Sequence, residues 1–121
     1  TVSDRCAAGL AEDRSGPLLV RALTEAGHTV TSRVIPDGEE SVAGALREAI
    51  AAGARLVLTT GGTGVAPRDR TPEGTRAVID RELPGVAELL RAAGTAVSAH
   101  AALSRHHGHR WVPNGPAGAV R

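Results

Sequence analysis

The chain has 121 residues and a formal net charge of +1, which is the size and charge balance of one small domain. So small a net charge gives no broad electrostatic field for a nucleic-acid backbone, and Trp111 is the only aromatic side chain on which a base could stack. Lysine does not occur, which excludes a Walker lysine and a Schiff-base lysine. We therefore expect one domain that does not bind nucleic acid.

A single cysteine, Cys6, excludes an internal disulfide and favours a reducing compartment such as the cytoplasm. No apolar run approaches about 18 residues and no signal-like segment opens the chain, so neither a membrane span nor secretion is predicted. We expect one cytoplasmic domain over residues 1–121. Because the first residue is Thr1 rather than methionine, truncation at both ends stays open, and the first strand is expected to be short.

The first half of the chain alternates helix and strand signals. Residues 15–26 place their apolar side chains on one helical stripe, with Ser15 as a candidate N-cap. Residues 28–35 are alternating and β-branched, which predicts a strand. A Pro-Asp-Gly turn at 36–38 then leads into a second predicted helix over 39–53, whose first turn carries two favourably placed glutamates.

The second half continues the same alternation. Residues 54–60 are a continuous apolar run of strand length, typical of a parallel strand with helices on both faces. A glycine-rich loop follows, and Thr71 as N-cap with proline at the first helical position predicts a helix over 72–83. A further helix is predicted over 84–94, starting at its proline.

This order of elements predicts an α/β fold, namely a three-layer, doubly wound, mostly parallel sheet with helices on both faces. Sheets of this kind bind ligands at the carboxyl ends of their strands. The Pro-Asp-Gly turn and the glycine loop each follow a predicted strand and precede a helix. Two loops that are far apart in the sequence are therefore expected to face one crevice.

The glycine loop lies in the stretch "TTGGTGVAPRDRTPE", residues 59–73. Gly61, Gly62 and Gly64 allow the backbone to approach a ligand closely and to point amide N–H groups at an anion, which favours a phosphate-bearing ligand. The stretch matches neither the Walker motif nor the dinucleotide fingerprint. An ordinary glycine-rich turn between strand and helix therefore stays open from the pattern alone.

Two aspartates stand beside these loops. Asp37 has a plain structural interpretation, because Pro-Asp-Gly is an ordinary turn and Asp37 could cap the next helix. Asp69 lies between two arginines, and since Thr71 already supplies a cap, its carboxylate has no evident structural role beyond a surface ion pair. Asp69 is therefore the stronger candidate for chemistry.

Three other features carry weaker signals. The cluster of His106, His107 and His109 lacks the paired ligand spacing of zinc sites, so we interpret it as a solvated segment rather than a metal site. Ser104 has no aspartate partner beside these histidines, which argues against a hydrolase triad. Cys6 is interpreted as a small passive thiol.

Five stretches of the chain together resemble a known family. The segments "TVSDR", "IPDG", "TTGGTGVAPRDRTPE", "ELPGVAELLR" and "LSR" occur in the order and approximate spacing of the molybdopterin adenylyltransferase family of molybdenum-cofactor biosynthesis. The resemblance runs from residue 1 to about residue 105, and the continuation "APRDRTPE" resembles the stand-alone adenylyltransferases. It implies an α/β fold, usually trimeric, that transfers AMP from ATP to the terminal phosphate of molybdopterin with Mg²⁺ and releases pyrophosphate.

The same resemblance implies a set of site residues. Asp37 and Asp69 match the two essential carboxylates of the family, with Mg²⁺ as their metal. The residues implied to line or border the substrates are Ser3, Asp4, Thr60, Gly61, Gly62, Thr63, Gly64, Arg68, Ser104, Asn114 and Pro116.

The tail differs from the family pattern. An apolar strand and an Asn-Leu-Pro-Gly-like segment are expected there, whereas this chain has "HHGHRWVPNGPAGAVR", in which only Asn114 and Pro116 match. Two other functions therefore stay open at this point. One is a non-catalytic molybdopterin-binding carrier or scaffold, and the other is a nucleotide pyrophosphatase or amidase-type enzyme on the same fold.

Overall fold

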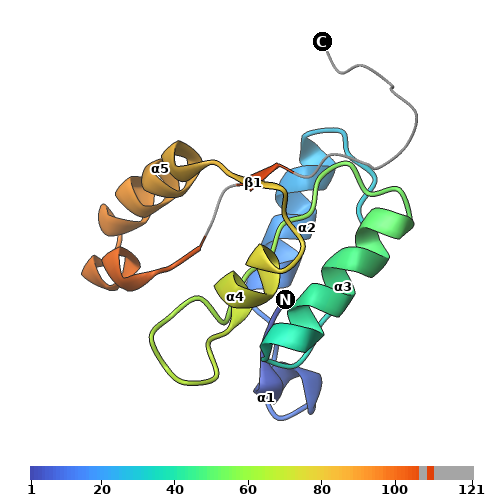
Figure 1. Cartoon of the computed structure of the whole chain (residues 1–121), viewed down its shortest axis with the longest axis horizontal. Helices are drawn as coiled ribbons and strands as arrows, with labels where there is room; N and C mark the ends of the chain where they lie inside the picture. The colour runs from blue at the N-terminus through green and yellow to red at the C-terminus, as the bar shows by residue number, and fades with distance from the viewer. Residues whose placement is uncertain (107–108, 111–121) are drawn as a thin grey trace.

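The computed structural model of the chain describes residues 1–106 and the backbone of residues 109 and 110. The described part is mainly helical (Figure 1). Its elements, in chain order, are α1 (Asp4–Ala7), α2 (Ser15–Glu25), α3 (Glu39–Ala51), α4 (Thr71–Arg76), β1 (Arg81–Glu82), α5 (Pro84–Thr95), the 3₁₀ helix η1 (Ala99–Leu103) and β2 (His109–Arg110).

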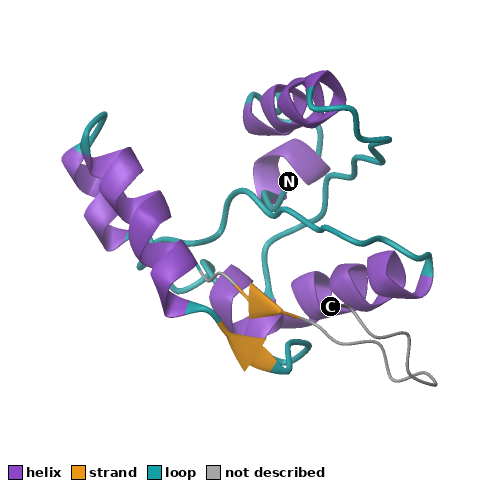
Figure 2. Ribbon diagram, turned by 90° about the horizontal axis from the view of Figure 1, so that it is seen from above, coloured by secondary structure: helices purple, strands orange, loops and turns teal. Residues whose placement is uncertain are grey.

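Three extended segments run side by side through the middle of the molecule. The amide of Val2 donates to the carbonyl of Thr60 over 2.8 Å, and the amide of Ser3 donates to the carbonyl of Ile35 over 2.9 Å. Residues 1–3 therefore lie between the end of the 28–35 segment and the end of the 54–60 segment. Figure 2 shows these segments between α2 on one side and α3 with α4 on the other.

The predicted parallel strands need a correction. Within the described residues, parallel pairing is limited to one bridge between Val2 and Ile35, and residues 28–34 and 54–60 form no regular strand. In the part of the chain that is described, backbone amides join these segments to the first segment only at Val2, Ser3 and Ile35, which gives too few hydrogen bonds for a regular parallel ladder. The regular ladder is instead antiparallel, between β1 and β2, and pairs Arg81 with Arg110.

The hydrophobic core lies where α3 faces the extended segments and α4. Val42 is fully buried and Leu46 is 6% exposed, one turn apart on the inner face of α3, and both pack with Val2. Gly74 of α4 meets the same face so closely that an added Cβ would lie 2.7 Å from Cβ of Val42. Glycine at this position is therefore what allows α4 to contact α3.

The starts of two helices differ from the sequence prediction. The first turn of α2 is capped by Asp13 rather than Ser15, because Oδ1 of Asp13 accepts from the amides of Ser15 (3.1 Å) and Gly16 (3.0 Å). Hydrogen bonds from the Thr1 hydroxyl and then from the Gly16 amide lower the pKa of Asp13. Thr71 is the first residue of α4 and not its cap.

The helix predicted over 72–83 is much shorter in the structure. α4 ends at Arg76, and residues 81 and 82 form β1 instead. Nε of Arg76 donates to Oε1 of Glu82 over 2.7 Å, which ties the end of the helix to the strand. Backbone pairing with β2 and this ion pair together override the local helical pattern, which is a tertiary effect.

Candidate active site

The glycine loop is built from backbone shapes that other residues do not adopt easily. Gly61 and Gly62 have φ of 93° and 61°, in the left-handed region. A Cβ on Gly61 would collide with the carbonyl oxygen of Val2, and one on Gly62 would lie 3.0 Å from Oδ1 of Asp37. Both glycines therefore let the loop lie against the first segment and the Pro-Asp-Gly turn.

Thr71 fastens this loop to α4. Its hydroxyl donates to the carbonyl of Gly61 over 2.9 Å and its amide donates to the carbonyl of Gly62 over 3.0 Å, and the residue is only 2% exposed. Because Thr71 is the first residue of α4 and this helix has no side-chain cap, its hydroxyl is not the cap that the sequence predicted. The consequence is a rigid connection between the loop and the buried face of α4.

Asp37 is joined to Asp4 by a reciprocal pair of hydrogen bonds. Oδ2 of Asp37 accepts from the amide of Asp4 over 2.8 Å, and Oδ1 of Asp4 accepts from the amide of Asp37 over 3.0 Å. The alternative that Asp37 caps the next helix is wrong, because α3 follows Gly38 and has no side-chain cap. Oδ1 of Asp37 faces Gly62, so this carboxylate borders the glycine loop.

Asp69 has a structural role that the sequence did not reveal. Its Oδ2 accepts from the amide of Ala66 over 3.1 Å and its own amide donates to the carbonyl of Ala66 over 3.0 Å, which closes the turn after the glycine loop. The same Oδ2 lies 2.6 Å from where a Cβ on Gly64 would be. The structure thus places Asp37 and Asp69 against the same loop, at Gly62 and Gly64.

Asp4, near the chain start, also contacts the stretch that holds the glycine loop, through Arg68. Nε of Arg68 pairs with Oδ2 of Asp4 over 2.8 Å, and the Arg68 side chain is 73% exposed. Oγ of Ser3 accepts from the amide of Cys6 over 3.3 Å and so caps α1. Thr60 contacts the first segment through its carbonyl. Arg68 therefore neutralises Asp4 in this structure.

A chain of hydroxyls leads from the loop to the end of η1. Oγ1 of Thr63 lies 2.9 Å from Oγ of Ser104, which in turn lies 2.6 Å from Nδ1 of His106. The predicted residues Thr63 and Ser104 are thus brought together from positions 41 residues apart. His106 was interpreted as part of a solvated segment, but it is half-buried and bonded to a predicted site residue.

Arg105 is a site residue that the sequence argument overlooked. Its amide donates to the carbonyl of Thr63 over 2.9 Å and its Nε to the carbonyl of Gly64 over 2.8 Å, while Nη2 donates to the carbonyl of Asp69. The only signal for it was the motif "LSR", in which it is the third residue. Arg105 therefore supports both the glycine loop and the turn that carries Asp69.

The same guanidinium also binds an acid of α4. Nη1 of Arg105 lies 2.5 Å from Oε1 of Glu73, and this hydrogen bond is the main reason why the pKa of Glu73 is lowered, partly opposed by burial. The sequence assigned Glu73 only to a helix start. Glu73 and Arg105 in fact connect α4 to the segment after η1.

Two predicted residues, Asn114 and Pro116, lie outside the described residues, as does the side chain of His109 and the whole of His107. Within residues 1–106, no three His, Cys, Asp or Glu side chains gather in a group that could hold a metal ion by themselves. Carboxylate oxygens of Asp37 and Asp69 are nevertheless the ligand type that Mg²⁺ takes, with water and substrate phosphates completing its shell. Both side chains are therefore of the type that a Mg²⁺ site uses.

The described helices include none that is long and apolar enough to cross a membrane. What the site offers is a close-approach glycine loop bordered by two carboxylates and by hydroxyl and guanidinium groups. Residues 1–119 match the family described as the probable molybdopterin binding domain, and the chain belongs to this family.

Two relatives of the chain are named molybdopterin adenylyltransferases. The chain is 46% identical over 92 residues to the molybdopterin adenylyltransferase of Pyrococcus furiosus, an alignment that covers 76% of this chain and 54% of that protein. It is 41% identical over 112 residues to the molybdopterin adenylyltransferase of Escherichia coli K12, covering 89% of this chain and 57% of that protein. The chain thus spans just over half the length of these relatives.

Solved structures agree with this family. A molybdopterin biosynthesis protein from Mycobacterium abscessus superposes with a TM-score of 0.85 at 42% identity, covering 91% of this chain and 70% of that one. Its likeness supports the α/β fold class that the sequence predicted.

Proposed function

We propose that the chain is a molybdopterin adenylyltransferase that transfers AMP from ATP to the terminal phosphate of molybdopterin and releases pyrophosphate. The observation that carries this proposal is the position of Asp37 and Asp69, which both border the glycine loop although they are 32 residues apart in the sequence. Membership of the family and the names of the relatives support the substrates.

The chemistry explains why carboxylates rather than a general base stand at this site. The attacking group is a phosphate monoester, whose second pKa of about 6 leaves it mostly deprotonated at neutral pH. The difficulty is the approach of one polyanion to another. Positioning and charge neutralisation are therefore what the protein must supply, as in other phosphoryl transfers.

We propose that Asp37 and Asp69 hold Mg²⁺, which when bound neutralises phosphate charge and orients the α-phosphate. Each carboxylate is positioned by one oxygen, since Oδ2 of Asp37 accepts from Asp4 and Oδ2 of Asp69 accepts from Ala66. The second oxygen of each, Oδ1, is then the atom offered to the metal.

The remaining residues are proposed to contact the substrates. Amide groups of the glycine loop would donate to phosphate oxygens, and Arg68 would exchange its exposed pair with Asp4 for a phosphate. The full proposed set comprises Ser3, Asp4, Thr60, Gly61, Gly62, Thr63, Gly64, Arg68, Ser104, Asn114 and Pro116.

Three broader features also belong to the proposal. The layered arrangement of helices around the extended segments supports a three-layer, doubly wound fold. The pairing at Val2, Ile35 and Thr60 would lie at the centre of its sheet. We propose a homotrimer or higher homo-oligomer as the assembly. The cytoplasmic location and the single domain over residues 1–121 stay predictions of the sequence.

The decisive test is Asp69→Asn, assayed by pyrophosphate release from ATP in the presence of molybdopterin and Mg²⁺. The amide oxygen of asparagine can still accept from Ala66, so the fold should persist while turnover falls by about 100-fold or more, the size of effect expected when one charged group is lost from such a site. Glu88→Gln, on the exposed surface of α5, is the matched control and should keep full activity.

The opposite results have clear meanings. Near-normal turnover in Asp69→Asn would contradict the assignment. A wild-type chain that binds molybdopterin but releases no pyrophosphate would identify it as a carrier or scaffold instead, and release of AMP without any pterin would indicate a nucleotide pyrophosphatase.

A further inference from the structure

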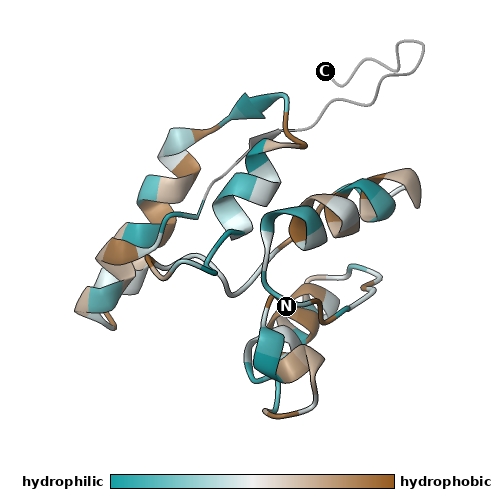
Figure 3. Ribbon diagram, turned by 60° about the horizontal axis from the view of Figure 1, so that its bottom comes forward, coloured by the Kyte–Doolittle hydropathy of each residue, from teal (hydrophilic) through white to brown (hydrophobic). Residues whose placement is uncertain are grey.

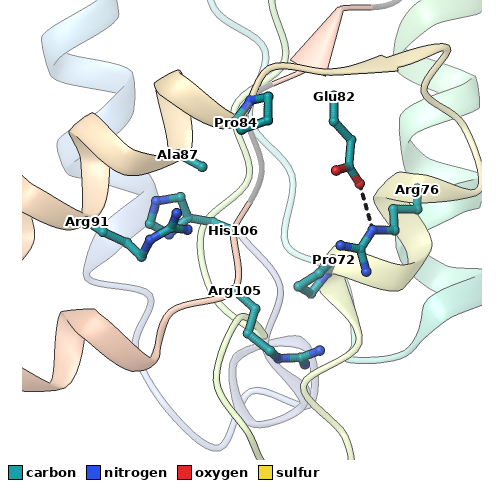
Figure 4. Close-up of a pocket in the computed structure, with 8 residues that line it drawn as sticks. All are labelled: Pro72, Arg76, Glu82, Pro84, Ala87, Arg91, Arg105 and His106. Carbon is teal, nitrogen blue, oxygen red and sulfur yellow. Dashed lines mark hydrogen bonds and ion pairs between the residues drawn. The ribbon is translucent and has the colours of Figure 1, made fainter.

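A positively charged cavity lies beside the glycine loop, between α4, α5 and the segment after η1. Its volume is about 260 Å³, and its walls carry Arg76, Arg91, Arg105 and His106 with Glu82 as the acidic side chain (Figure 4). Ligand pockets for drug-sized molecules are commonly larger than about 300 Å³. The cavity therefore suits a small ion rather than a nucleotide.

Two of its guanidinium groups are already occupied. Arg76 is bonded to Glu82 over 2.7 Å, and Arg105 binds Glu73 and the loop carbonyls. Within residues 1–106, the half-buried side chain of Arg91 has neither an ion pair nor a hydrogen bond. Arg91 thus brings an uncompensated positive charge into the cavity.

His106 contributes a second unsatisfied group. Its Nε2 is buried and has no hydrogen-bond partner among the described residues. Its Nδ1 lies 2.6 Å from Oγ of Ser104, so if the serine donates, the neutral imidazole carries its proton on Nε2 and requires an acceptor there. Leaving a buried donor without an acceptor is costly, so this atom is a candidate contact for a ligand with oxygen acceptors.

The two groups converge. Figure 4 shows Arg91, from α5, and His106, after η1, pointing toward one another from different walls of the cavity. Pro72, Pro84 and Ala87 form the apolar part of the wall, which strengthens charge interactions inside. A guanidinium fork and an imidazole N–H are donors only, so the complementary ligand is an anion with several oxygen acceptors.

We propose that this cavity binds a small tetrahedral oxyanion of the phosphate type, held by the guanidinium of Arg91 and by Nε2–H of His106. The site is separate from the carboxylates of the proposed adenylyl transfer and does not depend on that function. It is nevertheless linked to the loop, because Ser104 bonds both His106 and Thr63. A bound anion fixes the direction of these hydrogen bonds, from Thr63 to Ser104 to Nδ1 of His106.

The test is calorimetric titration of the full chain with inorganic phosphate at neutral pH and low ionic strength, where charge interactions are least screened. Wild type should bind phosphate saturably, and Arg91→Gln should weaken binding at least about tenfold. Arg21→Gln removes an exposed arginine of α2 and should leave binding unchanged. Because Arg91 has no partner to lose within residues 1–106, its variant should unfold in urea like wild type.

A second measurement concerns His106 itself. Long-range ¹⁵N NMR of the imidazole should show the Nε2–H tautomer when phosphate is bound, and His106→Ala should weaken phosphate binding as Arg91→Gln does. Absence of saturable binding to wild type would overturn the proposal. So would binding that survives Arg91→Gln but is lost in Arg68→Gln, because the phosphate would then occupy the glycine loop.

Discussion

The α3–α4 region and the α5–η1 region each contain an amphipathic helix, α3 and α5, but these two helices differ in packing. α3 buries Val42, Ala43 and Leu46 against α4 and the extended segments, whereas the only buried residue of α5 is Ala87. Leu89 and Leu90 of α5 are 74% and 53% exposed, and Figure 3 shows hydrophobic and hydrophilic stretches alternating along both helices. An amphipathic pattern thus predicts a helix equally well in both regions, but it does not say whether the apolar face is covered within the chain.

The two regions also differ in how they contact the glycine loop. The glycine loop is bound to α4 through the buried Thr71, so its backbone is supported by the core. The segment after η1 contacts the loop through the amide and guanidinium of Arg105 and the hydroxyl of Ser104. The α3–α4 region therefore supports the loop backbone from the core, while the segment after η1 borders the site on one side.

The largest effect should come from paired leucine truncations. Leu46→Ala removes a side chain that is 6% exposed, and it should lower the free energy of unfolding by about 2–5 kcal/mol. Leu89→Ala removes one that is 74% exposed and should change it by less than about 0.5 kcal/mol. Urea unfolding of both variants measures the contrast. A large loss in Leu89→Ala would show that this face of α5 is covered.

Paired glycine substitutions should give the next largest difference. In Gly74→Ala the new Cβ would lie 2.5 Å from the carbonyl oxygen of Glu39 and 2.7 Å from Cβ of Val42, so overpacking should cost about 1–3 kcal/mol. Gly85→Ala meets nothing within 4 Å on α5, and the better helix propensity of alanine should stabilise the chain by up to about 1 kcal/mol. Thermal unfolding followed by circular dichroism measures both. Equal stability of the two variants would contradict the tight contact of α3 with α4.

The smallest effect concerns Glu73 and Arg105, which join the two regions. The pKa of Glu73 is lowered from 4.5, chiefly by the hydrogen bond from Arg105, so the pair stabilises the fold above pH 4.5 and this contribution is lost as the pH falls through the lowered folded-state pKa. Glu73→Gln should cost about 1 kcal/mol at pH 7, and the difference from wild type should shrink in acid.

Urea unfolding at several pH values measures this difference. Glu48→Gln is the control, because its pair with Arg33 is exposed and should contribute less than about 0.5 kcal/mol. If Glu73→Gln were as stable as wild type at pH 7, the connection between α4 and the segment after η1 would carry no free energy.

Much of the helical structure followed from local pattern. The starts of α3 and α5 were predicted to the residue, because an acidic first turn and a proline act within a few residues. The predicted strands over 28–35 and 54–60 are not regular elements in the structure, since a strand needs a partner and, within the described residues, their backbone amide pairing with the first segment is limited to Ile35 and Thr60. The early end of α4 depends on pairing with β2, which no local pattern around residues 77–83 reveals.

The candidate site, too, could be predicted from the sequence only in part. The sequence by itself determined the glycine loop, because left-handed backbone and close approach at Gly61 and Gly62 require glycine. It also singled out Asp37 and Asp69 as residues, though not their partners. Only the tertiary structure decided that Asp37 bonds Asp4, that Asp69 closes its own turn, and that Arg105 supports the loop. The contacts of Asp37 with Asp4 and of Arg105 with Gly64 join positions 33 and 41 residues apart, so their geometry is set by packing rather than by local preference. The contact of Asp69 with Ala66 spans only three residues, but it forms within the turn that the folded backbone makes there.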